Sequence, residues 1–319
     1  MGTHASKALE ATHEPDPAPH ERAVLSRTHQ LLRSLGGKWK APVMYIDGFL
    51  DEDLERHVYE ALRRHGGGKE IYVVLSSKGG SVAVARKIVH LLREYCDSYD
   101  VVIPFRAASA ASLICLGARC IGMGSMSEIG PIDAHLSGSN GSDSGLLSAA
   151  DIEAIQPALQ SWFGLRGYRF NARAVERLSK QVFLPSIGAA HRASNFVRST
   201  ALDFLAYQVP GPMRKRRRIV EFLCSRDAHE YPITWDEAAA IGLNVARLTS
   251  EEESEVWAAW QSARAAFAEA PGMLAFTSQP TGVILAPHFT AVRRQHLVPG
   301  PDGTPEGFIK WDIVPDCDL

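Results

Sequence analysis

Short apolar runs that alternate with amphipathic segments constrain this chain more than any other feature. The runs at 43–47 (VMYID), 70–77 (EIYVVLSS) and 99–105 (YDVVIPF) are rich in β-branched and aromatic residues, which is typical of buried strands. Between them, segments 51–66 and 80–96 carry apolar residues at helical spacing. Strands that alternate with helices are joined by right-handed crossovers and form a mainly parallel sheet. The chain is therefore predicted to be an α/β protein.

The composition along the chain predicts three parts. Residues 1–20 are rich in Pro, His, Glu and Ala and are expected to form a mobile tail. Residues 21–250 are expected to hold the α/β core, with a leading helix before the first strand and a mostly helical second half. Residues 251–319 are expected to add a helix and a small β appendage. A Gly/Ser-rich stretch at 136–145 (LSGSNGSDSG) is predicted to be a flexible loop.

The charge and the apolar pattern argue against nucleic-acid and membrane-spanning classes. The formal net charge is -2, so global electrostatics do not favour a polyanion partner. The basic run at 213–218 (MRKRRR) is expected to be a solvated helix start or a contact between subunits. The apolar run at 101–118 is interrupted and too short to span a bilayer, and the N-terminal residues lack the apolar core of a secretion signal. The protein is expected to be soluble and cytoplasmic.

The sequence also predicts no metal and no cofactor. Its five cysteines are scattered without a CxxC pair, which indicates neither a zinc site nor a disulfide framework. Cys115 and Cys120 are expected to be small core residues. The segment 229–237 gathers His and acidic residues but lacks an HExxH-type spacing, and no GxGxxG follows a predicted strand.

The turn SSKGGS (76–81) is the first candidate for chemistry. In open parallel sheets, sites form beyond the carboxyl ends of the strands, and this turn follows a predicted strand. It lacks the spacing of a phosphate-binding P-loop. Gly79 and Gly80, adjacent and just before a helix, still allow the backbone to point N–H groups outward. Such groups can hold a phosphate or an oxyanion.

The stretch RAASAAS (106–112) is the second candidate. It places Ser109 at the head of a predicted helix, where the positive end of the helix dipole lies. The next N–H, on Ala110, is expected to face the same small volume as the glycine turn. Together the two turns predict a nucleophile with an oxyanion hole, as acyl transfer requires. The alternative is that Ser109 and Ser112 only cap the helix and pack.

Four ordered motifs resemble the Clp/crotonase superfamily. Segment 74–92 (VLSSKGGSVAVARKIVHLL) followed by 106–118 (RAASAASLICLGA) resembles the Clp protease proteolytic subunit and signal peptide peptidase A. Those families carry a Ser-Pro-Gly-Gly-like turn, then Ala-Ala-Ser at a helix head. Segments 124–135 (GSMSEIGPIDAH) and 231–245 (YPITWDEAAAIGLNV) are similar to later motifs of the signal peptide peptidases. The combination most resembles the branch called serine dehydrogenase proteinase.

The resemblance assigns roles by position. It implies that Ser109 is the nucleophile and that Gly79, Gly80 and Ala110 supply the amides of the oxyanion hole. It further implies a ββα-repeat core, a peptide or protein substrate, and a homo-oligomer whose active chambers form between subunits. Lys78 stands where the relatives usually have proline, which alters the turn and adds a charge.

The general base is where this chain departs from those families. The position of the Clp histidine falls near Pro131, and that of the peptidase lysine falls within 148–151, which has no lysine. An unassisted serine hydroxyl is a poor nucleophile at neutral pH, so another base is needed. The candidate substitutes are His135, Lys180 and His191, with Asp133 as a residue that could orient a histidine or cap the turn.

Three functions follow from these observations. The first is a serine peptidase that forms an acyl-enzyme on Ser109. The second is a catalytically inactive scaffold that binds a peptide or a partner protein through the same groove, which the missing base favours. The third is a crotonase-type enzyme in which the same two loops polarise the carbonyl of an acyl-CoA thioester.

Overall fold

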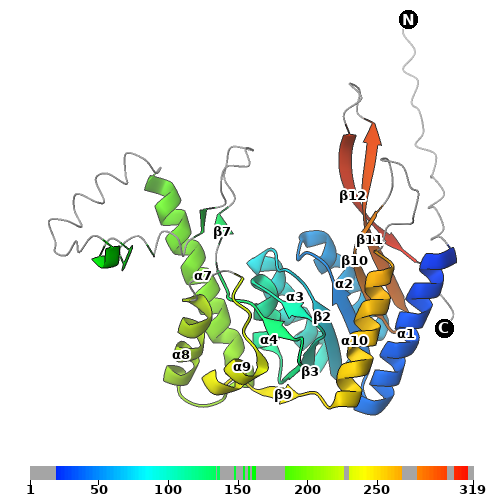
Figure 1. Ribbon diagram of the computed structural model, residues 1–319, viewed down its shortest axis with the longest axis horizontal. Helices are drawn as coiled ribbons and strands as arrows, with labels where there is room; N and C mark the ends of the chain where they lie inside the picture. Colours follow the sequence, from blue (N-terminus) through cyan, green and yellow to red (C-terminus); the bar gives the residue numbers. More distant parts are fainter. Residues whose placement is uncertain are drawn as a thin grey trace, which may run out of the picture.

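An eight-stranded mixed sheet with helices on both faces organises the protein (Figure 1). The computed structural model describes residues 19–133, 135–136, 147–148, 154, 157–158, 160–162, 184–225, 230–267, 279–299 and 305–314. In sheet order the strands are β12 (Pro305–Ile313), β11 (Phe289–Pro299), β10 (Gln279–Ala286), β1 (Val43–Asp47), β2 (Gly68–Ser76), β3 (Cys96–Ile103), β5 (Ile121–Met123) and β9 (Val245–Arg247). The neighbours from β1 to β9 are parallel, and β10 to β12 are antiparallel. The prediction of an α/β protein with a mainly parallel sheet is confirmed.

Both faces of the sheet are buried, which explains the continuous apolar runs in the sequence. On β1, Met44 and Ile46 belong to the core beneath α2 (Glu52–His65), α3 (Val82–Tyr95) and α4 (Ala110–Gly117). The alternate residues Val43 and Tyr45 belong to a second core. That core lies beneath α1 (Pro19–Trp39) and α10 (Ser250–Ala265), which pack side by side on the opposite face (Figure 1). The period-2 geometry of a strand thus divides each run between two cores.

The helices begin and end at residues whose chemistry fits those positions. Asp51 caps α2, because its carboxylate accepts the N–H of Leu54 at 2.9 Å, and Gly66 ends the helix at φ 77°. α7 (Leu184–Gln208) and α8 (Met213–Cys224) follow at one end of the sheet, where α7 packs on α4. α9 (Trp235–Ile241) has a capping box between Thr234 and Glu237, as its sequence predicts.

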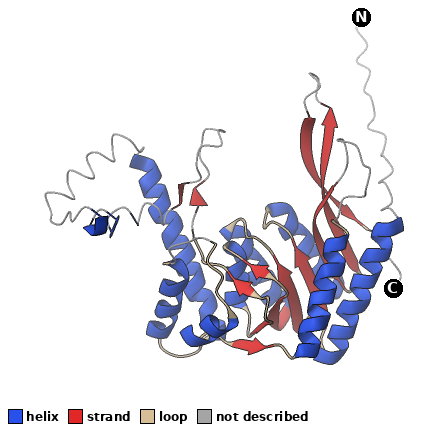
Figure 2. Cartoon of the chain, viewed as in Figure 1, coloured by secondary structure: helices blue, strands red, loops and turns tan. Residues whose placement is uncertain are grey.

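The C-terminal strands belong to the central sheet and do not form a separate appendage. β10 pairs antiparallel with β1, with Tyr45 opposite Leu285, and β11 and β12 continue the same sheet outward (Figure 2). Ile284 and Val283 are fully buried, one in each core. The strand-like sequence of this region is confirmed, but its expected separation from the core is corrected, because these strands cover the open edge of β1.

A second, shorter set of strand pairings runs beyond the carboxyl ends of the parallel strands. It includes β4 (Arg106–Ala107) and β6 (Glu128–Ile129), which are parallel neighbours. Each of the first three strands is followed by one of these short segments and then by a helix. The pairings, in order, are Leu50–Gly80, Ser77–Ala107, Ala107–Ile129 and Ile129–Ile233. They tie together the loops that carry the candidate residues.

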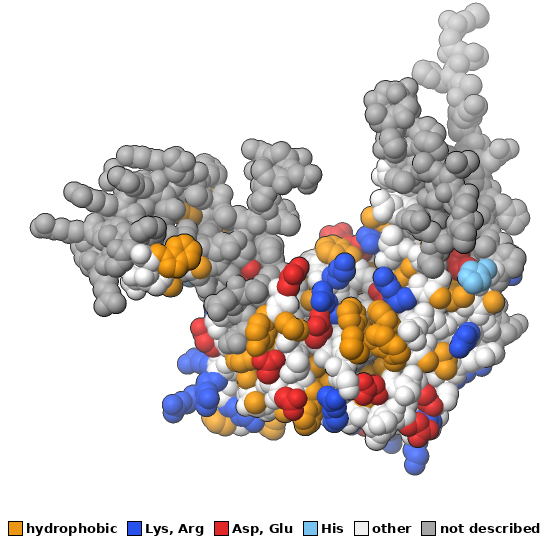
Figure 3. Space-filling model, viewed as in Figure 1, with side chains coloured by type: hydrophobic (Ala, Val, Ile, Leu, Met, Phe, Trp, Pro, Cys, Tyr) orange, Lys and Arg blue, Asp and Glu red, His pale blue; other side chains and the backbone are white. Residues whose placement is uncertain are grey.

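Several expectations fall on residues outside the described part. These are the tail before residue 19, most of the Gly/Ser-rich loop, and most of residues 148–181 in the second half, which was expected to be mostly helical. Among the helices that are described, none combines the length and hydropathy needed to cross a bilayer. Over the described part of one face, Lys and Arg side chains are interspersed with Asp and Glu (Figure 3).

Candidate functional site

The diglycine turn and the serine turn meet at the carboxyl ends of β2 and β3. A Cβ atom placed on Gly79 would lie 2.8 Å from the carbonyl oxygen of Ala108 and 2.8 Å from the Cβ of Ser109. Gly79 also has φ 104°, a conformation that favours glycine. The two loops are therefore in direct contact, as the strand pattern predicts, and this contact depends on the missing side chain at Gly79.

Ser109 has an unusual backbone conformation. Its φ is 53° and its ψ is -124°, so this residue lies outside the regions that L-residues prefer. Such a conformation costs on the order of 1–3 kcal/mol and persists only where surrounding structure holds it. The side chain is half-buried and makes no capping hydrogen bond to α4, although Ser109 precedes the first residue of that helix. A simple capping role for Ser109 is therefore not what the structure shows.

The amide of Gly79 is already engaged within the turn. Its N–H donates to the Oγ of Ser77 at 3.0 Å, and that hydroxyl donates to the carbonyl of Gly48 at 2.6 Å. Ser77 is buried and was not singled out by the sequence, where its only signal is its position directly before the Lys-Gly-Gly turn. Gly79 therefore allows the two loops to approach each other closely. Its N–H is already hydrogen-bonded to Ser77 and is not free for an oxyanion.

The N–H groups of Gly80 and Ala110 remain suited to stabilise an oxyanion. The N–H of Leu50 donates to the carbonyl of Gly79 at 2.9 Å, and the N–H of Ser81 donates to the carbonyl of Leu50 at 2.8 Å. This parallel bridge turns the N–H of Gly80 away from Leu50. Ala110 is the first residue of α4, so its N–H has no acceptor within the helix and lies at the positive end of the dipole.

Ser112 joins the serine turn to the loop that follows β6. Its fully buried hydroxyl lies 3.0 Å from the carbonyl of Ala107 and 2.7 Å from the carbonyl of Gly130. The N–H of Gly130 donates to the carbonyl of Ala107 at 2.8 Å. A Cβ on Gly130 would lie 2.8 Å from the Cα of Ala108. Ser112 therefore packs and holds loops together, and it is not available as a second nucleophile.

A cavity of about 430 Å³ is lined by Ser76, Ser77 and Lys78, the residues directly before the diglycine pair. Asp47 lies in its wall, where the hydroxyl of Tyr45 donates to its carboxylate at 3.0 Å and Arg264 lies 3.7 Å away. Burial raises the pKa of Asp47. The indole N–H of Trp260 donates to the Oγ of Ser76 at 3.1 Å, which fixes the aromatic wall. The cavity and the Gly80 amide thus belong to the same loop.

The three candidate bases, His135, Lys180 and His191, come from separate parts of the chain. His135 belongs to β7 (His135–Leu136), which pairs with β8 (Leu147–Ser148), and its backbone alone is described. Lys180 lies outside the described residues. His191 is exposed on α7, where its ring nitrogen lies 3.0 Å from the side-chain amide of Asn195. The Ser109 hydroxyl makes no hydrogen bond that caps α4, and the side chains of His135 and Lys180 lie outside the described part of the chain.

The cysteines and acids of the described segments do not form a metal site. No group of three or more His, Cys, Asp or Glu side chains is placed there to hold an ion. Cys115 is fully buried, and burial raises its pKa far above the ordinary value; Cys96 is also buried, with its pKa raised to about 11. These thiols are packing residues at neutral pH.

Comparison with known proteins adds a relative without an assigned activity. No protein-family model matches the chain. The chain is similar to the Uncharacterized protein MJ0137 of Methanocaldococcus jannaschii, with 26% identity over 206 residues. The similarity covers 63% of this chain and 62% of that protein, so the chain spans less than two thirds of the relative's length.

Proposed function

We propose that the protein is a serine hydrolase that cleaves peptide bonds through an acyl-enzyme on Ser109. In this proposal the N–H groups of Gly80 and Ala110 stabilise the oxyanion that forms on the substrate carbonyl. The observation that carries the proposal is the contact between Gly79 and Ser109. A Cβ atom placed on Gly79 would lie 2.8 Å from the Cβ of Ser109. This contact supports the proposal, because acyl transfer needs a nucleophile close to backbone amides that can stabilise an oxyanion.

The proposed reaction proceeds in two steps. The Oγ of Ser109 forms a bond with the carbonyl carbon, its proton passes to a base, and the C–N bond breaks as the amine leaves with that proton. A water molecule then attacks the ester, the acid leaves, and the serine hydroxyl is restored. The proposed base is His135, whose strand follows the loop packed on the serine turn, with Lys180 or a residue of a neighbouring copy as the alternatives.

The arrangement of short pairings supports placing the chain in the Clp/crotonase superfamily. Three consecutive units of long strand, short segment and helix repeat along the chain. The short segments pair with one another beyond the sheet, and this brings the turns of successive units together. Such a repeat is what the sequence resemblance implies, and a homo-oligomer is part of the same proposal.

Labelling with a fluorophosphonate tests the proposed nucleophile. Wild-type protein should be modified at one site per chain within the range of about pH 6 to 10, which spans histidine- and lysine-assisted chemistry. Ser109→Ala should abolish the label. Ser81→Ala is the matched control, because Ser81 is an exposed serine that caps α3 one residue after the diglycine turn. Loss of the label in both variants, or in neither, counts against Ser109 as the nucleophile.

A peptide-binding scaffold without catalysis is the second candidate. It is favoured by the sequence, which has neither the Clp histidine near Pro131 nor the peptidase lysine within 148–151. Folded protein that takes up no label anywhere between about pH 6 and 10 would support the scaffold over the hydrolase.

A further inference from the structure

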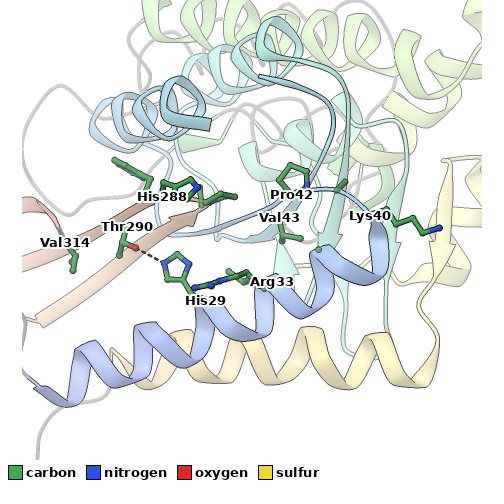
Figure 4. A pocket seen from close by; sticks show the side chains of 14 residues that line it. His29, Arg33, Lys40, Pro42, Val43, His288, Thr290 and Val314 are labelled. Atoms are coloured by element: carbon green, nitrogen blue, oxygen red, sulfur yellow. Dashed lines mark hydrogen bonds between the residues drawn. The ribbon is translucent and has the colours of Figure 1, made fainter. Parts of the chain in front are cut away.

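A second cavity lies at the amino end of β1, whereas Ser109 lies beyond the carboxyl ends of the parallel strands. It has a volume of about 630 Å³ and is bounded by α1, by the start of β1 and by the turn between β10 and β11 (Figure 4). Val43, the first residue of β1, lines it, whereas Ser109 follows the carboxyl end of β3. A ligand bound here would therefore not touch the proposed nucleophile, and the inference does not rest on the proposed function.

Among the described residues, the charged side chains that line this cavity are basic and none is an Asp or a Glu. Arg33 on α1 and Lys40 just after α1 contribute cations, and His29 and His288 contribute imidazoles. In Figure 4, Arg33 lies beside His29, while Lys40 points away along the rim. Arg33 is exposed to solvent and forms no ion pair with an acidic side chain of the described residues.

His29 and Thr290 form a neutral polar pair next to that charge. A ring nitrogen of His29 lies 2.7 Å from the Oγ1 of Thr290, across the cavity from α1 to β11. Burial, assisted by the neighbouring Arg33, lowers the pKa of His29 to about 4, so the ring is uncharged at neutral pH. The pair fixes the ring and leaves the guanidinium of Arg33 as the principal charge facing the cavity.

The remaining wall is apolar. It includes buried Leu32, Val43, Phe289 and Val314, which come from α1, β1, β11 and the residue after β12. The volume lies within the range of about 300–1,000 Å³ that small-molecule sites occupy. One guanidinium with an apolar wall suits a singly charged ligand that has an apolar body, because a polyphosphate would need several cations close together.

We propose that this cavity binds a small organic carboxylate. The carboxylate lies against the guanidinium of Arg33, which can donate two parallel hydrogen bonds to it. The apolar body lies against the wall formed by Leu32, Val43 and Val314. His29 and Thr290, already hydrogen-bonded to each other, border the polar end of the ligand.

Binding of straight-chain carboxylates from butanoate to octanoate, followed by saturation-transfer NMR and calorimetry, tests this site. At least one carboxylate of the series should bind the full-length protein with a Kd below about 10 mM. The matching primary amide should bind at least about tenfold more weakly. Arg33→Gln should weaken carboxylate binding about tenfold. Arg27→Gln is the matched control, because Arg27 is exposed on the same helix and does not line the cavity.

Three results would overturn the proposal. They are no binding by any member of the series, equal binding of acid and amide, and equal effects of Arg33→Gln and Arg27→Gln. Binding should be unchanged in Ser109→Ala, and loss in that variant would place the ligand at the other site instead. Because labelling at Ser109 is measured separately, a failure here is distinguishable from a failure of the hydrolase proposal.

Discussion

Gly79 and Ser109 touch across two loops that are separated by a whole helix and strand in the sequence. A methyl group on Gly79 would lie 2.8 Å from the Cβ of Ser109 and 2.8 Å from the carbonyl oxygen of Ala108. Real Cβ atoms do not approach that closely, so only glycine permits this contact. The diglycine turn therefore lies directly against the serine turn, and the proposed oxyanion hole depends on this contact.

Gly79→Ala should damage the site more than an equivalent substitution elsewhere. Gly211→Ala is the matched control, because Gly211 has φ 108°, close to the φ 104° of Gly79, and has open space around its Cβ position. Both variants should lose about 1 kcal/mol from backbone strain. Gly79→Ala should lose about 1–3 kcal/mol more from overpacking, measured by urea unfolding. Its fluorophosphonate labelling should fall at least about tenfold, and equal labelling of the two variants would contradict the account.

Ser77→Ala should loosen the diglycine turn. The buried Ser77 hydroxyl accepts a hydrogen bond from the N–H of Gly79 at 3.0 Å and donates one to the carbonyl of Gly48 at 2.6 Å. Its removal therefore takes away the partner of that N–H and of that carbonyl. The expected loss is about 1–3 kcal/mol in the free energy of unfolding, with slower labelling of the folded protein. Ser254→Ala, an exposed serine on α10, should stay within about 0.5 kcal/mol. A Ser77→Ala variant as stable as this control would show that the hydroxyl does not hold the turn.

The C-terminal strands should be essential to the fold. Ile284→Ala removes a fully buried side chain on β10 and should cost about 2–5 kcal/mol in a single cooperative unfolding transition. Ile309→Ala, on β12 with 48% of the residue exposed, should cost less than about 0.5 kcal/mol. Two separate transitions, with Ile284→Ala affecting only the smaller one, would indicate an independent appendage.

Stability should fall on mild acidification because of His29. Its pKa is about 4 in the folded protein, against 6.5 for a histidine exposed to water, so the unfolded chain binds the proton first. The contribution is fully present above pH 6.5 and is lost as the pH falls towards 4. Between pH 7 and pH 5 the wild type should lose roughly 1–2 kcal/mol more than His29→Gln, by urea unfolding. His20→Gln, at an exposed site on α1, should follow the wild type.

Local sequence signals were sufficient for most elements of the core. Asp51 and Gly66 mark the ends of α2 as capping chemistry predicts, and the β-branched runs became β1, β2 and β3. The pairing of β10 with β1 could not be predicted, because local periodicity indicates a strand but not its distant partner. The same limitation led to the expectation of a separate C-terminal appendage.

The candidate site was predictable in position but not in atomic detail. Parallel strands end at one edge, so the turns at Gly79 and Ser109 were expected to meet there. The engagement of the Gly79 N–H by Ser77 depends on a single side-chain rotamer, which no sequence pattern specifies. The φ of 53° at Ser109 is likewise not a conformation that serine favours, so the sequence could not predict it; Gly79 and Gly130 both lie close to this turn.

A crystal structure of the protein after reaction with a fluorophosphonate shows whether Ser109 is the nucleophile and which amides face the oxyanion. The phosphorus should be bonded to the Oγ of Ser109, with one phosphonyl oxygen about 2.7–3.1 Å from the N–H groups of both Gly80 and Ala110. An adduct whose oxygen points to solvent, or protein that remains unmodified at Ser109, would contradict the hydrolase proposal.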